Sequence, residues 1–139
     1  MDVITRSISF HSRAGEIVDI TRQVSDALRD SGLSDGTVTV FVPGATGAVS
    51  TIEYEPGLVR EDLPRALERI APVDADYGHD AAWHDGNGYS HVRATLMGPS
   101  LAIPFKARRL LLGTWQQVIF VNHDNRSRDR EVILQFMGK

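Results

Sequence analysis

The sequence predicts an α+β protein in which two or three helices gather on a largely antiparallel sheet. Several short segments alternate apolar and polar positions and are rich in β-branched side chains, as strands are. Other segments repeat apolar residues at the spacing of an amphipathic helix. The predicted strands come in runs, with the longest run at the end of the chain, and this order is typical of the α+β class.

The first half of the chain is predicted to contain one helix among several extended segments. The helix begins at Asp19 or Thr21, carries Val24 and Leu28 on one face, and stops at Gly32. The extended segments are rich in branched and aromatic residues, which fit a pleated surface. They cover residues 3–10, 16–20, 37–42 and 48–54.

The second half is predicted to begin with an amphipathic helix over residues 58–71, with a break near Pro64. Residues 72–89 show almost no apolar period and are expected to form a long polar loop. Gly86 and Gly88 would let this loop approach a ligand closely. The remaining predicted strands cover residues 100–104, 110–112, 116–122 and 131–137.

Length and composition predict one domain and exclude several kinds of chemistry. A chain of 139 residues with 42% hydrophobic and 24% charged residues is ordinary for a globular protein. The absence of cysteine excludes disulfides, thiolate ligands and a thiolate nucleophile. No apolar stretch is long enough to cross a membrane, and no signal peptide is recognised, so we expect a cytoplasmic protein without a membrane partner. The net charge of −3 argues against nucleic acid as a partner.

Histidines concentrate in the polar segment, which makes it the candidate metal site. His79, His84 and His91 lie within thirteen positions, with Asp85 among them. Neutral imidazole is the commonest protein ligand for metals, and neighbouring carboxylates orient it. We therefore expect these histidines to hold a divalent ion such as Zn²⁺. The alternative is that they hydrogen-bond the loop backbone. His123 lies apart in the chain and is expected to be a turn residue.

A short helix over residues 91–97, capped by Ser90, would place a possible phosphate site beside the histidines. The free amides at the start of a helix favour anions. Arg93 in the first turn could grip phosphate through two nitrogens, although an exposed helical charge explains it equally well. Asn87 is a further candidate for binding the substrate.

Glu53 and Glu55 stand two positions apart, so both side chains would point to the same face of a strand. Paired carboxylates suit Mg²⁺ binding or general base catalysis. From composition alone, solvated charges at the rim of the sheet are the favoured interpretation.

Two motifs connect the sequence to a known family. Gly-Pro-Ser-Leu-Ala-Ile-Pro at 98–104 and Gly-Thr-Trp-Gln at 113–116 resemble the signature of the YjbQ-like family, and the resemblance covers nearly the whole chain. Many members carry a His-Thr-Ser/Thr-Ala motif where this chain has Pro-Gly-Ala-Thr-Gly-Ala at 43–48. The first histidine of that motif is missing here. Tyr89 also stands where members often have histidine.

The resemblance implies a β-sandwich-like core, a homotrimer with sites near subunit boundaries, and a weak secondary thiamine-phosphate synthase activity. That reaction joins a thiazole phosphate to hydroxymethylpyrimidine diphosphate and releases diphosphate. With the residues above, it implies a metal (Zn²⁺ or Mg²⁺) and a small phosphate substrate. Catalytic roles would fall to Glu53, Asp85 and His91, and Thr46 would join the substrate-binding residues. The alternatives are a non-catalytic trimeric metal- or anion-binding protein and a metal-dependent hydrolase.

Overall fold

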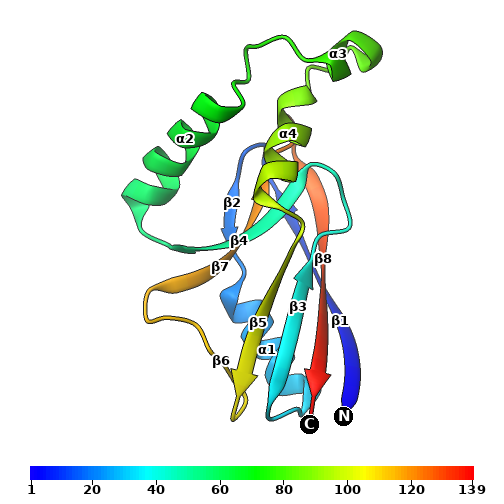
Figure 1. Cartoon of the computed structure of the whole chain (residues 1–139), viewed down its shortest axis with the longest axis vertical. Helices are drawn as coiled ribbons and strands as arrows, with labels where there is room; N and C mark the ends of the chain where they lie inside the picture. The colour runs from blue at the N-terminus through cyan, green and yellow to red at the C-terminus, as the bar shows by residue number, and fades with distance from the viewer.

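Two antiparallel sheets and four α-helices form the structure, which confirms the predicted α+β class (Figure 1). The computed structural model describes residues 1–139. One sheet has five strands in the order β1-β8-β3-β5-β6, and the other has three in the order β2-β7-β4. The elements are β1 (Asp2–Ser12), β2 (Ile17–Asp19), α1 (Thr21–Ser31), β3 (Gly36–Phe41), β4 (Gly47–Glu53), a π-helix η1 (Leu58–Asp62), α2 (Leu63–Ile70), α3 (Gly78–Trp83), α4 (Gly88–Met97), β5 (Ser100–Lys106), β6 (Arg109–Leu110), β7 (Gln116–Asn122) and β8 (Arg128–Gly138).

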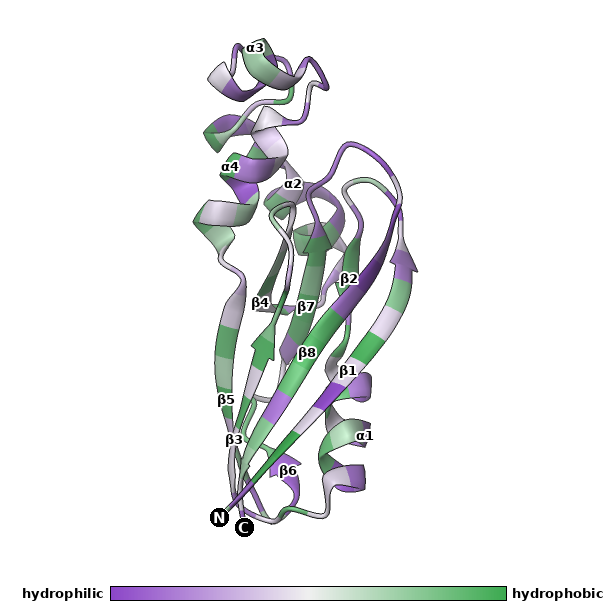
Figure 2. Ribbon diagram, turned by 90° about the vertical axis from the view of Figure 1, so that its right-hand side faces the viewer, coloured by the Kyte–Doolittle hydropathy of each residue, from purple (hydrophilic) through white to green (hydrophobic).

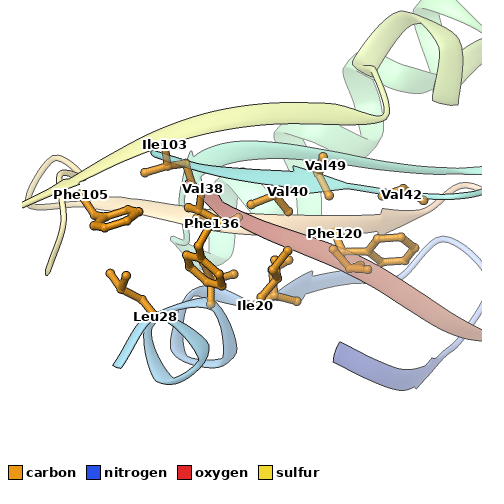
Figure 3. Close-up of a cluster of buried hydrophobic side chains, with 14 of the residues drawn as sticks. Ile20, Leu28, Val38, Val40, Val42, Val49, Ile103, Phe105, Phe120 and Phe136 are labelled. Carbon is orange, nitrogen blue, oxygen red and sulfur yellow. The ribbon is translucent and has the colours of Figure 1, made fainter. Parts of the chain in front are cut away.

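The hydrophobic core lies between the two sheets, with α1 covering one side. β8 alternates as a half-buried strand should, since Val132, Leu134 and Phe136 are fully buried while their neighbours are more exposed. Figure 2 shows the hydrophilic first part of β8 followed by its mostly hydrophobic second part. In Figure 3, Ile20 and Leu28 point from the α1 side toward the same cluster. Burial of these side chains is the main source of stability, at roughly 1.5–3 kcal/mol for each large one.

Helix α1 shows how local sequence anchors an element to the sheets. Asp19 accepts hydrogen bonds from the amide and the hydroxyl of Thr21, at 3.0 and 2.7 Å. The Thr21 hydroxyl oxygen accepts a bond from the Val118 amide at 2.8 Å, which ties the start of the helix to β7. Gly32 ends the helix with φ of 76°, a conformation that glycine adopts without strain.

The polar segment differs from the sequence prediction. Residues 72–89 are not a continuous loop, because the six residues Gly78–Trp83 form α3. Helix α4 begins at Gly88 instead of residue 91, so Ser90 lies inside the helix and does not cap it. A third difference concerns the strand predicted over residues 110–112, because β6 covers Arg109–Leu110 instead. None of the helices combines the length and the apolar character that crossing a membrane requires.

Helices α2, α3 and α4 gather at one end of the molecule, while the chain termini lie at the other (Figure 1). The connection between β7 and β8 reaches the same end, because its residue Asn125 hydrogen-bonds residues just before α4. This end therefore brings together polar residues from the middle and from the last quarter of the chain.

Candidate functional site

A histidine and two carboxylates converge between α3 and α4. Nδ1 of His79 lies 3.2 Å from an oxygen of Asp80 and 3.5 Å from an oxygen of Asp85. One potential ligand atom from each of the three lies within 4.8 Å of the others. The ring of His91 lies beside that of His79, with 4.5 Å between the ring centroids. We call these four residues the histidine–carboxylate cluster.

Backbone amides at the start of α4 hold the two aspartates of the cluster in place. Oδ1 of Asp80 accepts a hydrogen bond from the Gly88 amide at 2.9 Å, which joins α3 to the first residue of α4. A side chain at position 88 would not fit, because a Cβ atom there would lie 2.5 Å from Cβ of Tyr77. Oδ1 of Asp85 accepts a bond from the Asn87 amide at 3.1 Å. The second carboxylate oxygen of each aspartate makes no hydrogen bond within the chain and is free to bind an ion.

The donor set of the cluster suits a divalent transition metal. Zn²⁺ binds imidazole nitrogen together with carboxylate oxygen, whereas Mg²⁺ prefers oxygen alone. The side chains are partly open to solvent, with 29%, 26% and 47% exposed for His79, Asp80 and Asp85. The cluster therefore has room for ligands from solution beside the protein ligands.

Of the three histidines predicted to bind metal, the structure brings two together. The rings of His79 and His91 are neighbours, whereas no such contact joins His84 to them. Of the three histidines, only His79 belongs to the group of potential ligand atoms with Asp80 and Asp85. His84 instead ends α3 in the left-handed conformation, with φ of 54°. Asp80 was not among the predicted ligands. Its position directly after His79 was the available signal, but only a helix at this point brings it toward Gly88.

The predicted substrate-binding residues Asn87 and Ser90 are buried and bonded to each other. The Asn87 side-chain oxygen accepts bonds from the Ser90 hydroxyl and, at 3.1 Å, from the Asn125 amide. The Asn125 side chain donates to the carbonyl of Asp85 at 2.9 Å. These contacts fasten the β7–β8 connection to the segment that carries the cluster.

Thr46, also predicted to bind substrate, belongs to a buried network beneath that connection. Its hydroxyl donates to Asp124 at 3.0 Å and accepts from Arg130 at 3.0 Å. Arg128 donates to the same oxygen of Asp124 at 3.1 Å. Burial raises the pKa of the Asp124 carboxyl. Hydrogen bonds from Thr46 and Asn87 and the charge of Arg128 together lower it by more than burial raises it, so the net pKa is below the usual value. Asp124 is therefore a carboxylate at neutral pH.

Glu53 does not approach the cluster within one chain. Gly47 starts β4 opposite Asn122, close to the β7–β8 connection, while Glu53 ends the strand opposite Gln116. At roughly 3.3 Å per residue, Glu53 lies about 20 Å further along the strand. Glu55 accepts bonds from the amides of Gly57 and Leu58, which lower the pKa of its carboxyl. The two glutamates therefore do not form a carboxylate pair at the cluster.

Arg93 packs against α2 and the chain that follows it. Its Nε donates to the carbonyl of Ala71 at 2.9 Å, and its Nη2 pairs with Glu68 at 2.8 Å. The guanidinium also lies over the Tyr89 ring, 4.9 Å from the centroid. Arg93 is thus on the opposite side of α4 from His91 and does not face the cluster.

His123 has a larger role in the fold than a turn residue usually has. It lies in the β7–β8 connection, as expected, but is only 3% exposed, and its amide donates to the Thr46 carbonyl at 2.8 Å. Burial, together with the charges of Arg93 and Arg130, lowers the pKa of its imidazole to about 4. His123 is therefore neutral at pH 7. Its neighbours come from distant parts of the chain, so no local pattern in the sequence indicates this burial.

The fold and the cluster define an α+β protein of two antiparallel sheets with a histidine–carboxylate site at one end. The chain belongs to the YjbQ-like family, since residues 6–139 match the family model described as "UPF0047 protein YjbQ-like".

Relatives and solved structures agree with this membership. A UPF0047 protein of Methanothermobacter thermautotrophicus is 39% identical over 140 aligned positions, which span 100% of this chain and 95% of that protein. A crystal structure from Sulfolobus solfataricus, described as a YbjQ-like protein of unknown function, gives a TM-score of 0.89 at 26% identity and covers 99% of this chain and 100% of that one. A YjbQ/UPF0047 family protein from Clostridium acetobutylicum gives 0.83 at 35% identity, covering 96% and 99%.

Proposed function

We propose that this chain is a metal-dependent transferase that joins a thiazole phosphate to hydroxymethylpyrimidine diphosphate, with weak activity. The observation that carries the proposal is the convergence of His79, Asp80 and Asp85, with His91 against the His79 ring. The family resemblance supplies the reaction, and the cluster supplies the charge chemistry that the reaction needs.

The proposed reaction forms a carbon–nitrogen bond and breaks a carbon–oxygen bond. The thiazole nitrogen attacks the methylene carbon, and the electron pair of the broken bond leaves with diphosphate. A divalent ion bound at the cluster would supply positive charge for the departing diphosphate. The chain itself positions the carboxylates of Asp80 and Asp85. Each accepts a hydrogen bond from a backbone amide at the start of α4 and remains partly open to solvent.

The proposed assembly is a homotrimer with the site near a subunit boundary. Val92 and Leu96, one turn apart on α4, are 38% and 65% exposed. An exposed apolar pair on a helix favours an interface. A boundary there would also allow Glu53 of another copy to approach the cluster, which one chain alone does not allow. Light scattering on the purified protein checks the number of subunits.

The experiment combines metal analysis with product formation from the two precursors. Protein dialysed against chelator is reloaded with Zn²⁺ or Mg²⁺, and thiamine phosphate is measured for the wild type, His91→Ala and Asp85→Asn. We expect both variants to lose at least tenfold in activity and in metal affinity. His11→Ala is the matched control, because His11 also pairs with an aspartate, at 2.8 Å, but has no third ligand.

A second candidate function is metal or anion binding without catalysis. The specific observation in its favour is that Glu53 and Arg93, which were expected to assist the reaction, do not face the cluster. Metal bound at one ion per chain with no product in the wild type would support this candidate. Product formation that is unchanged in His91→Ala and Asp85→Asn would overturn the proposed transferase site.

A further inference from the structure

A separate pocket lies on the other side of α4 from the histidine–carboxylate cluster. It encloses about 250 Å³ between the β1–β2 turn, α2, α4 and the end of β7. Figure 1 shows these elements meeting at the same end of the molecule. No residue of the cluster lines the pocket. Tyr89 and Arg93 are four residues apart on one face of α4 and point into the pocket, whereas His91 lies on the other side against His79.

Part of the pocket wall is apolar, and some polar atoms on its lining have no partner. Ile17, Leu67, Val73 and Val121 contribute to the walls. The volume is many times the roughly 10–15 Å³ that one water molecule needs. The pocket is thus large enough for a small ring or a short branched chain, and binding sites of this kind combine apolar walls with a few polar groups.

Three lining residues carry hydrogen-bonding atoms without a partner in the chain. Nε2 of His123 is buried and makes no hydrogen bond. Arg93 uses Nε and Nη2, but its Nη1 makes no hydrogen bond and is not buried. Tyr89 is only 8% exposed. Its hydroxyl makes no hydrogen bond within the chain, and the hydroxyl oxygen itself is not buried. Buried polar groups in proteins are rarely unpaired, so Nε2 of His123 points to a ligand. The open Arg93 and Tyr89 atoms are available to the same ligand.

The charges around the pocket favour an anion. Arg93 is on the lining and pairs with Glu68 through Nη2, which leaves its Nη1 open. Arg130 lies close enough to His123 for its charge to act on the imidazole. Asp124 is the acidic residue on the lining, but its carboxylate is occupied by Arg128 and Thr46. Burial is the largest cause of the lowered pKa of His123, and the positive charges of Arg93 and Arg130 lower it further.

We propose that this pocket binds a small organic anion, a carboxylate or a phosphate monoester. The anionic group accepts hydrogen bonds from Arg93 and Tyr89 and lies beside His123, and the apolar body packs against Ile17, Leu67 and Val73. Arginine is suited to this role because its planar guanidinium matches the geometry of carboxylate and phosphate oxygens. The inference does not depend on the transferase activity or on a metal.

The test uses full-length protein freed of metal by chelator, with benzoate, phenyl phosphate and the uncharged benzamide as probes. Binding is followed by calorimetry and by the NMR signal of the His123 ring. We expect both anions to bind, to shift the His123 signal, and to bind at least tenfold more tightly than benzamide. The tighter of the two anions identifies the preferred head group.

Single substitutions inside and outside the pocket test where the anion binds. Tyr89→Phe removes one hydroxyl and keeps the packing, so we expect about fivefold weaker binding, the value of one hydrogen bond. Arg93→Gln should weaken binding more than tenfold, and Arg69→Gln, an exposed arginine of α2 outside the pocket, should leave it unchanged. Asp85→Asn should also leave it unchanged, which separates this pocket from the cluster.

Three results would overturn the inference. The first is no binding of either anion at millimolar concentration, and the second is equal binding of benzamide. The third is anion binding that requires added metal or that Tyr89→Phe and Arg93→Gln do not change. Because Tyr89→Phe preserves the ring, it decides the location even if Arg93→Gln fails to fold.

Discussion

The burial of His123 makes the stability of the fold depend on pH. Its pKa is about 4 in the folded protein against an ordinary value of 6.5. Between these values the unfolded chain binds the proton and the folded chain does not, so the free energy of unfolding falls as the pH falls from 6.5 to 4. One pKa unit corresponds to about 1.4 kcal/mol, so the loss attributable to His123 is about 3 kcal/mol.

His123→Gln should remove this part of the pH dependence, because glutamine does not take up a proton. Urea unfolding at pH 7, 5.5 and 4.5 measures the change, and His11→Gln, an exposed histidine, is the control. A slope between pH 6.5 and 4.5 that is the same in His123→Gln and the wild type would contradict the prediction.

Gly88 is needed because α3 and α4 meet at its α-carbon. A Cβ atom at this position would lie 2.5 Å from Tyr77 Cβ and 3.0 Å from Oδ1 of Asp80. Gly88→Ala should therefore push α3 away and weaken Zn²⁺ binding at the cluster by roughly 10- to 100-fold, as loss of supporting contacts does. Gly78→Ala is the matched control, because no atom lies within 4 Å of a Cβ there. Equal Zn²⁺ affinity of the two variants in calorimetry would refute this role.

At the residue scale, the sequence predicted where polar residues gather but not which of them lie side by side. The crowding of His79 and His91 was visible in the chain, and the two rings do lie together. The predicted metal ligands included His84 and left out Asp80, because the spacing of residues in an expected loop does not show where their side chains point. In the structure α3 ends at His84, and His84 does not join the group of potential ligands formed by His79, Asp80 and Asp85.

Among the elements, α4 is central because it separates two sites. Its first turn contacts α3 through Gly88, and Asn87, just before it, holds the β7–β8 connection. The sequence predicts this helix but places its first residue three positions too late. The reason is that Ser90 is a common capping residue, whereas here its hydroxyl bonds back to Asn87 from within the helix. Helix α3, with six residues, is too short to show a helical period.

Asn87→Ala should loosen the β7–β8 connection from α4. The substitution leaves the buried Ser90 hydroxyl and the Asn125 amide without their acceptor, which costs about 1–3 kcal/mol. We expect a lower unfolding free energy and faster hydrogen exchange at the Asn125 amide. Asn125→Ala, which removes an exposed side chain but keeps that amide bond, should cost less. Slow exchange at this amide in Asn87→Ala would show that the connection is held by other contacts.

For the whole molecule, the strands were predictable but their order was not. Alternation in residues 3–10 and 131–137 indicates two strands, yet nothing local shows that β1 and β8 pair along their full length, from Asp2 opposite Gly138 to Ser12 opposite Arg128. Such pairing joins the two ends of the chain and depends on the shared core. The sandwich-like arrangement came from the family resemblance, and the two sheets agree with it.

The separation of the core from the cluster leads to a prediction about metal removal. None of His79, Asp80, Asp85 and His91 belongs to the core between the sheets, whose buried residues lie in α1 and the strands and their flanks. The protein should therefore stay folded after chelation, unlike small domains whose folding depends on zinc.

Adding Zn²⁺ at 100 times its dissociation constant should then raise the unfolding free energy by about 2.7 kcal/mol in the wild type, because the ion binds the folded state only. The same addition should have little effect on His79→Ala, in which the cluster lacks its central imidazole. Calorimetric melting with and without metal measures both effects. Unfolding of the wild type on chelation would show that the cluster supports the fold itself, and equal stabilisation of His79→Ala would place the ion elsewhere on the molecule.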